Sequence, residues 1–296
     1  MLRRLSVPLV VLCWLGVLPA AAQDASSLSQ RLLPLIEAHR GQVGVAVEHL
    51  ERGDRFVYRA EEAFPTASLI KFPVLIELYR QAQEGRLDLK SQVTLRDGDK
   101  VPGSGILTPH FSDGAKFALV DAARLMIAYS DNTATNLVLD RIGIAATGES
   151  MQVLGCPNTR IHSKVFRRDT TIDCERSERY GLGSTTAAEM VRLLGALHRK
   201  ELVSAEASEA MLAHLKACDD KLKFRRFLPD DAVLAFKTGS VDAVRTAAGI
   251  LYTPAGPVAL CVLTAENEDR RWTRDNAGDV LCAEIAREVF TAFDRR

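Results

Sequence analysis

Ser68 and Lys71 form a pair of side chains whose types and spacing suit nucleophilic catalysis. Ser68 stands at the start of an apolar stretch that is too long for a strand, so a helix is expected to begin there. The free backbone N–H groups and the dipole at a helix N-terminus favour negative charge on the serine oxygen. Lys71 emerges on the same helix face, and its apolar neighbours would lower the pKa of its amine. The pair can act as nucleophile and base, although a capping serine and a snorkelling lysine would give the same letters.

A Ser-Asp-Asn triplet at positions 130–132 falls between two predicted helices. In a catalytic interpretation, Ser130 passes a proton and Asn132 forms a hydrogen bond with Lys71 or with a substrate. The structural alternative stays open, because Ser, Asp and Asn are the residues that any tight interhelical turn prefers.

A Lys-Thr-Gly triplet at positions 237–239 follows a predicted strand at 233–236. Lys237 and Thr238 have the charge and the hydroxyl group to hold a substrate carboxylate, and Gly239 would let the backbone approach another segment closely. An edge-strand lysine followed by a turn would give the same pattern.

The three strings are more informative together than alone. From average residue usage, Ser-x-x-Lys is expected about once by chance in a chain of this length, whereas each triplet would occur in roughly one chain in fifteen or twenty. Together they resemble the signature of class A β-lactamases and penicillin-binding proteins. The resemblance extends to Pro73, to Asn136 and to residues 103–107, which look like the family's loop on the active-site rim. It covers nearly the whole chain beyond residue 22.

The resemblance implies a penicillin-recognising serine hydrolase that opens β-lactam amides through an acyl-serine intermediate. Ser68 would be acylated by the lactam carbonyl, with the backbone N–H groups of Ser68 and Ser240 as the oxyanion hole. Arg245 is similar to the family's additional carboxylate anchor, although the turn before it is one residue shorter; a surface arginine without a role is the alternative. The implied substrate is a small-molecule β-lactam or a D-alanyl peptide-like compound, and no cofactor is implied.

The sequence departs from the family at one chemically important position. Class A enzymes carry a glutamate after the Ser-Asp-Asn helix that activates the deacylating water, whereas residues 160–168 contain no acid. A well-placed general base contributes roughly two to four decades in rate, so its loss would slow deacylation and spare acylation. Glu175 or Glu178 could supply a base, Lys71 could serve both steps, or the acyl-enzyme could persist.

A persistent adduct would change the expected function. It would indicate a penicillin-binding D,D-peptidase-like enzyme, or another serine amidase or esterase with slow deacylation, because fold does not fix the substrate. A third hypothesis, from a different class, is a non-catalytic domain that binds β-lactams or peptides in the same pocket.

The elements that must position these residues follow from hydrophobic periodicity. Helices are predicted at 27–39, at 69–80, across much of 119–215 and at 276–293, and strands at 43–48, 56–58, 233–236, 247–252 and 258–263. This order predicts an α+β fold, with an antiparallel sheet formed by the N- and C-terminal segments, flanked by helices, and an inserted all-helical lobe. We expect one catalytic domain over 23–296, with an α/β lobe at 23–65 and 216–296 and a helical lobe at 66–215.

The first 22 residues have the features of a cleaved signal peptide: two arginines, an apolar run and an Ala-Ala-Ala site before Gln23. An uncleaved anchor is the alternative. Without Arg3 and Arg4, 36 of the 38 basic residues remain against 38 acidic ones, which gives no electrostatic reason to expect nucleic acid or a membrane as a partner. We expect a periplasmic or secreted monomer without membrane association after cleavage.

Cysteines and histidines give no metal signature. Five cysteines follow the leader, so at least one thiol should be free, and whether Cys156 pairs with Cys174 stays open. No Cys-x-x-Cys pair and no histidine pair at helical ligand spacing occurs, so no metal is expected.

Overall fold

The computed structural model describes residues 20–294, with side chains from Leu28 onward. The predicted leader lies outside the described residues except for its last three positions, which begin helix α1 (Ala20–Ala38). Within the described range, none of the helices is both long enough and apolar enough to cross a membrane.

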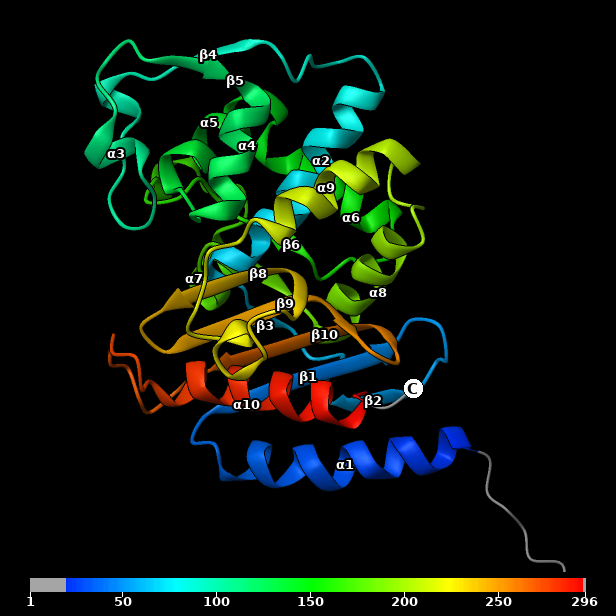
Figure 1. The fold of residues 1–296 in the computed structure, drawn as a ribbon. Coiled ribbons are helices and arrows are strands. Elements are labelled where there is room, and N and C mark those ends of the chain that lie inside the picture. The colour runs from blue at the N-terminus through cyan, green and yellow to red at the C-terminus, as the bar shows by residue number, and fades with distance from the viewer. Residues whose placement is uncertain (1–19, 295–296) are drawn as a thin grey trace, which may run out of the picture.

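A five-stranded antiparallel sheet, in the order β2–β1–β10–β9–β8, joins the two ends of the chain (Figure 1). Its strands are β1 (Gln42–His49), β2 (Arg55–Tyr58), β8 (Val233–Val241), β9 (Val244–Thr253) and β10 (Gly256–Ala265). The N-terminal and C-terminal segments pair directly, since Val45 of β1 lies opposite Val262 of β10. The predicted α+β fold with a shared antiparallel sheet is therefore confirmed.

Helices cover both faces of this sheet. On the lower face in Figure 1, α1 and α10 (Ala277–Ala292) bury Leu32 and Ile285 against Val45 and its neighbours on β1. On the other face, α8 (Ala187–His198) packs against β1, β9 and β10. Because both faces are covered, the central strand β10 is buried along almost its whole length, which explains its continuous apolar sequence.

A helical lobe lies above the sheet in Figure 1, with α2 (Lys71–Gln83) at its centre. Helix α2 is buried on almost all sides, the environment that a helix with apolar residues all round requires. It contacts α4, α5, α6 and α9. The helices of this lobe besides α2 are α3 (Leu107–His110), α4 (Leu119–Ala128), α5 (Asn132–Ile142), α6 (Ile144–Val153), α7 (Cys174–Tyr180) and α9 (Ala205–Lys216).

Short elements connect the lobes. The small sheet β3–β7–β6 ties the segment before Ser68 to the irregular stretch at 160–185, and β4 pairs with β5. Their bounds are β3 (Phe64–Pro65), β4 (Gln92–Thr94), β5 (Lys116–Ala118), β6 (Arg160–Ile161) and β7 (Gly183–Thr185). Four 3-10 helices span Ala67–Ile70, Asp97–Asp99, Arg168–Thr170 and Phe224–Phe227.

Two predicted boundaries beside the candidate site were wrong. Strand β8 does not end at residue 236, because its residues pair with β9 as far as Val241 opposite Val244. The Lys-Thr-Gly triplet therefore lies inside a strand, and the turn comes at 242–243. Ser68 lies in a 3-10 helix, and the α-helix begins only at Lys71.

The cysteines of the described chain are all free thiols, so the pairing of Cys156 with Cys174 is not formed. Cys156 is buried with its Sγ 3.8 Å from the carbonyl oxygen of Glu189, whereas Cys174 is exposed on α7.

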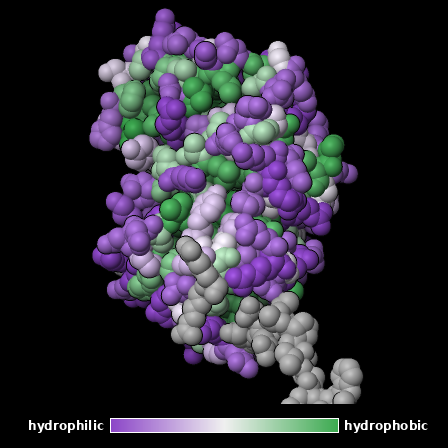
Figure 2. Space-filling view, turned by 45° about the vertical axis from the view of Figure 1, so that its right-hand side comes forward, coloured by the Kyte–Doolittle hydropathy of each residue, from purple (hydrophilic) through white to green (hydrophobic). Residues whose placement is uncertain are grey.

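The face drawn in Figure 2 is mainly hydrophilic, and its hydrophobic residues lie in small groups between polar ones. Large exposed hydrophobic side chains are few in the described chain, and four of them border the candidate site: Tyr129, Phe166, Val241 and Trp272. Trp272 is 67% exposed. An aromatic ring that solvent reaches this freely can contact a ligand.

Candidate active site

The turn that carries Ser68 is held against the sheet. Thr246 of β9 donates a hydrogen bond to the carbonyl oxygen of Thr66 at 2.8 Å, and the 3-10 helix packs on β8 and β9. A Cβ atom added at Gly239 would lie 2.7 Å from the backbone nitrogen of Ser68, closer than real Cβ contacts come. Glycine at 239 therefore lets strand β8 pass directly beside the backbone of Ser68.

Lys71 is fully buried at the start of α2, three residues after Ser68. Its ammonium group donates to the Ser130 carbonyl oxygen at 2.7 Å, to Asn132 Oδ1 at 2.9 Å and to Ser130 Oγ at 3.3 Å. Burial, together with the positive charge of Lys237, lowers the pKa of Lys71 well below its ordinary value, against a smaller opposing effect of Asp131. A neutral amine that can accept a proton is thus accessible beside Ser68.

The Ser-Asp-Asn triplet forms the corner between α4 and α5. Ser130 adopts a left-handed backbone conformation with φ of 51°, and Asp131 caps α5 by accepting from the Ala134 N–H at 2.8 Å. The other oxygen of Asp131 accepts from two N–H groups of the loop at 103–107, at 2.7 and 2.8 Å. Asp131 therefore holds that rim loop beside Ser130 and Asn132, a positioning role that sequence reasoning did not assign.

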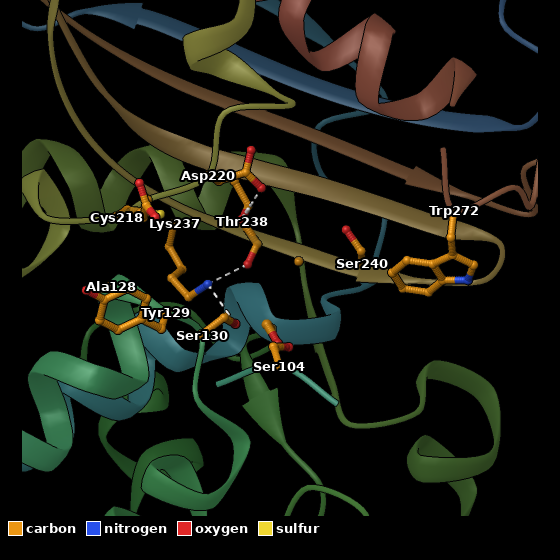
Figure 3. A pocket seen from close by; sticks show the side chains of 13 residues that line it. Ser104, Ala128, Tyr129, Ser130, Cys218, Asp220, Lys237, Thr238, Ser240 and Trp272 are labelled. Carbon is orange, nitrogen blue, oxygen red and sulfur yellow. Dashed lines mark hydrogen bonds between the residues drawn. The ribbon is translucent and has the colours of Figure 1, made fainter. Parts of the chain in front are cut away.

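Lys237 completes the group from strand β8. Its Nζ donates to Ser130 Oγ at 3.1 Å and to the Thr238 carbonyl oxygen at 2.8 Å, as the dashed lines in Figure 3 show. Burial lowers the pKa of Lys237. The Ser130 hydroxyl thus lies between two lysine amines, and the structure brings all three motifs together around Ser68.

An ionic cluster lies next to Thr238, which we define as Asp220, Lys223 and Asp279; Lys223 and Asp279 are buried, and Asp220 lines the hollow. The Thr238 hydroxyl donates to Asp220 Oδ2 at 2.9 Å, and Lys223 Nζ donates to Ser240 Oγ at 3.0 Å. Lys223 also lies 3.2 Å from Asp220 and 3.1 Å from Asp279. Sequence reasoning missed this cluster, because nothing in the local spacing of its members places them beside the Lys-Thr-Gly strand.

Arg245 is not brought to the nucleophile. Its side chain is 1% exposed and its guanidinium lies 4.7 Å from the ring of Trp272, where it donates to the backbone carbonyl oxygens of Val244 at 2.9 Å and of Arg271 at 3.0 Å. It also lies 3.4 Å from Asp279. These contacts fix the β8–β9 turn and the segment before α10, and Arg245 is not among the residues that line the two hollows at Ser68.

Two adjoining hollows open at Ser68. One, of about 330 Å³, is lined by Ser130, Lys237, Thr238 and the acidic residue Asp220. The other, of about 900 Å³, is more apolar and includes Val165 and Phe166. Ser68, Ser104, Ser240 and Trp272 border both. A ligand bonded to Ser68 would therefore meet a polar, charged wall on one side and an apolar one on the other.

An apolar residue, Val165, lies in the stretch at 160–168 that lacks the acid found in class A enzymes. Asn136 of α5 binds the backbone of Val165 twice, donating to its carbonyl oxygen at 3.0 Å and accepting from its N–H at 2.8 Å. Val165 is buried and lines the larger hollow with Ser68. Glu175 and Glu178 are exposed on α7, and neither lines the two hollows.

The carboxylates that do line the two hollows already have partners. Asp219 lies 3.4 Å from Lys221, and Asp242 accepts a hydrogen bond from Trp272 Nε1 at 3.0 Å. Asp220 is held in the ionic cluster. Among the described residues that line these hollows, each carboxylate therefore has an ion-pair or hydrogen-bond partner.

Comparison with known proteins places the chain in a family. The sequence profile of the beta-lactamase enzyme family matches residues 27–293. The chain therefore belongs to the beta-lactamase enzyme family, and the family predicted from the three motifs is confirmed. At the general level that this membership supports, the protein is a hydrolase of the beta-lactamase family.

Curated relatives align over most of the chain. Beta-lactamase SME-1 of Serratia marcescens is 25% identical over 286 residues, which cover 95% of this chain and 94% of that protein. An imipenem-hydrolyzing beta-lactamase of Enterobacter cloacae is 28% identical over 234 residues, which cover 77% of this chain and 78% of that protein.

Solved structures share the fold. A beta-lactamase from Sphaerobacter thermophilus superposes with a TM-score of 0.78 and 29% identity, covering 92% of this chain and 97% of that one. A PBP-A variant in an acyl-enzyme complex with penicillin G gives a TM-score of 0.78 and 25% identity, covering 91% of this chain and 97% of that one. The α+β fold predicted from the sequence is thus that of β-lactamases and of a penicillin-binding protein.

Proposed function

We propose that this protein opens β-lactam amides through an acyl-serine intermediate on Ser68, as a β-lactamase-type serine hydrolase with slow deacylation. The observation that carries the proposal is the buried Lys71 amine, which lies one turn from Ser68 and shares the Ser130 hydroxyl with Lys237. The base of lowered pKa is hydrogen-bonded to the proton carrier, and the nucleophile lines the same hollow as that proton carrier.

Acylation uses each member of that group. Lys71 as a neutral amine takes the hydroxyl proton of Ser68 while Ser68 Oγ bonds to the lactam carbonyl carbon. The N–H groups of Ser68 and Ser240 stabilise the oxyanion. The lactam C–N bond then breaks, Ser130 gives its proton to the nitrogen, and the Lys71 ammonium restores the proton of Ser130.

Deacylation lacks a comparable residue. Val165 supplies no proton acceptor on the apolar side of Ser68, and each lining carboxylate has a partner. The deacylating water must therefore be activated by Lys71, or it attacks without a dedicated general base. This supports a long-lived acyl-enzyme, as in a penicillin-binding D,D-peptidase-like protein that acts on D-alanyl peptides.

The intact Lys71 group argues against the third hypothesis, a purely non-catalytic binding domain. Export to the periplasm and a monomeric state remain part of the proposal.

Covalent labelling with a fluorescent penicillin tests the proposal. The wild-type protein should form one adduct per chain, seen by intact mass, and the adduct should be lost slowly after free penicillin is removed. Ser68→Ala should abolish the label, whereas Ser112→Ala, an exposed serine that lines neither hollow, should retain it. Labelling that survives in Ser68→Ala would rule out the acyl-serine assignment, and rapid loss of the wild-type adduct would rule out slow deacylation.

A further inference from the structure

Two exposed aromatic side chains, Phe166 and Trp272, line the larger hollow at Ser68. Phe166 is 62% exposed and Trp272 is 67% exposed. A single exposed apolar side chain is ordinary on a protein surface, but two large rings in one hollow form an apolar surface that gains free energy when a ligand covers it. The pair therefore points to a ligand group that packs on aromatic rings.

Phe166 occupies a backbone position that disfavours a large side chain. It is the third residue of a tight turn, in which the N–H group of Arg167 donates to the carbonyl oxygen of Lys164 at 3.2 Å. Its φ of 56° lies in the left-handed region, which favours glycine or asparagine at such turn positions. Because the ring is also exposed, neither the turn nor the hydrophobic core explains a phenylalanine here.

The ring of Phe166 is kept at the hollow by its neighbours. Asn136 fixes the backbone of Val165, the preceding residue, with two hydrogen bonds. A Cβ atom added at Gly103 would lie 3.3 Å from a carbon atom of the Phe166 ring, so the ring lies against the rim loop at 103–107. The side chain is thus supported from behind while most of its surface stays open.

Trp272 is held in a similar way from the sheet side. Its indole Nε1 donates to Asp242 Oδ1 at 3.0 Å, and the guanidinium of Arg245 lies over the ring, 4.7 Å from its centroid. Figure 3 shows the indole beside Ser240. Because these contacts fix the orientation of the ring before a ligand arrives, little conformational entropy is lost when the ring is covered.

We propose that Phe166 and Trp272 are specificity-determining residues, which select acyl donors with an aromatic ring in the acyl side chain. The inference rests on the proposed function, because it names the substrate class of the same site. The smaller hollow has the charge and the hydroxyl groups that suit the substrate carboxylate, so the larger and more apolar hollow is left for the acyl side chain. Aromatic rings pack favourably against one another, edge to face or offset.

Two penicillins that differ only in a phenyl group test this inference: the phenylacetyl and the acetyl derivative of the same nucleus. Acylation of the full chain is followed by intact mass, and each second-order rate constant is divided by the alkaline hydrolysis rate of the same probe. The wild-type protein should prefer the phenylacetyl probe by at least about tenfold, as the burial of one ring implies. Phe166→Gly and Trp272→Ala should each reduce this preference by about threefold or more.

The melting temperature separates recognition from a structural role. Glycine suits the left-handed turn position, and Phe166→Gly removes no buried ring, so this variant should melt at or above the wild-type temperature while its preference falls. Ile172→Ala is the matched control, because Ile172 is an exposed apolar residue of the same irregular stretch and lines neither hollow. It should leave both rates within about twofold.

A wild-type preference smaller than about tenfold would overturn the inference, and so would a preference that either Phe166→Gly or Trp272→Ala retains in full. A preference that falls in Phe166→Gly only together with the melting temperature would count against it as well. If neither probe labels Ser68 in the wild-type protein, the proposed function fails and the inference with it. Labelling by both probes without the predicted preference overturns the inference alone.

Discussion

At the residue scale, the proposed chemistry depends on the protonation state of one amine. Lys71 is fully buried with three acceptors around its Nζ, and burial and the charge of Lys237 make its neutral form accessible. A general base works only when deprotonated, so acylation should fall as the pH drops through the pKa of Lys71. Because that pKa is lowered well below the ordinary value of lysine, the fall should come at a correspondingly lower pH than an exposed lysine would give.

Replacing Lys237 should move this pH profile. Lys237→Gln removes the charge that helps to lower the pKa of Lys71, so the acidic limb of the acylation rate should shift to higher pH. The rate constant is measured at saturating β-lactam, which separates this effect from weaker binding. Lys100→Gln, a surface lysine paired with Asp97, serves as the control and should not shift the limb. An unchanged acidic limb in Lys237→Gln would show that the two amines are not coupled.

The sequence motifs predicted most side chains of the proposed reaction centre, but they did not predict the residues that surround those side chains. Ser68, Lys71, Ser130 and Lys237 could be proposed as site residues because their types and spacing within each motif are local in sequence. Asp220 contacts Thr238 only after the chain folds, and no local pattern encodes that contact. The same limit applies to Arg245. Its position after the β8–β9 turn could be predicted from the sequence, but the packing of its guanidinium against the ring of Trp272 could not.

At the element scale, the proposed mechanism makes the loop around Val165 the segment that sets the rate of deacylation. Asn136 fixes its backbone with two hydrogen bonds, so a longer side chain at 165 would extend into the larger hollow beside Ser68 from a defined position. The sequence itself shows that residues 160–168 contain no acid. It did not predict that Asn136 would hold the stretch in place without one.

A carboxylate introduced there should accelerate deacylation. Val165→Glu should shorten the lifetime of the penicilloyl adduct by about two to four decades, the usual contribution of a placed general base. Adduct loss is followed by intact mass after free penicillin is removed. Val165→Gln has nearly the same shape without the charge and should leave the lifetime within about threefold. Equal lifetimes in the two variants would mean that residue 165 does not reach the water that attacks the ester.

The ends of the helices and strands beside the site were predicted less accurately than the elements themselves. The Lys-Thr-Gly triplet reads locally as the end of a strand, yet the pairing with β9 carries β8 on to Val241. The 3-10 helix at Ser68 arises from contacts with β8 and β9 that lie far away in sequence. Tertiary pairing of this kind overrides local propensity.

At the scale of the whole molecule, the site is a junction between two parts of the chain. Lys71 and Ser130 belong to the helical lobe, whereas Lys237 and Gly239 belong to the sheet. One continuous hydrophobic core extends from α2 through α8 to the sheet, so the lobes are packed together and not merely linked. This order of elements was predictable, because strands at both ends of a chain with helices between them favour one shared sheet.

The most direct test of the proposed function is the acylation rate of Lys71→Met, which keeps the volume of the side chain and removes the amine. With a penicillin probe and intact-mass detection, we expect acylation of Ser68 to slow by at least about a hundredfold, while the melting temperature shows that the fold is retained. A Lys71→Met protein that is folded and is acylated within about twofold of the wild-type rate would contradict the assignment of Lys71 as the base.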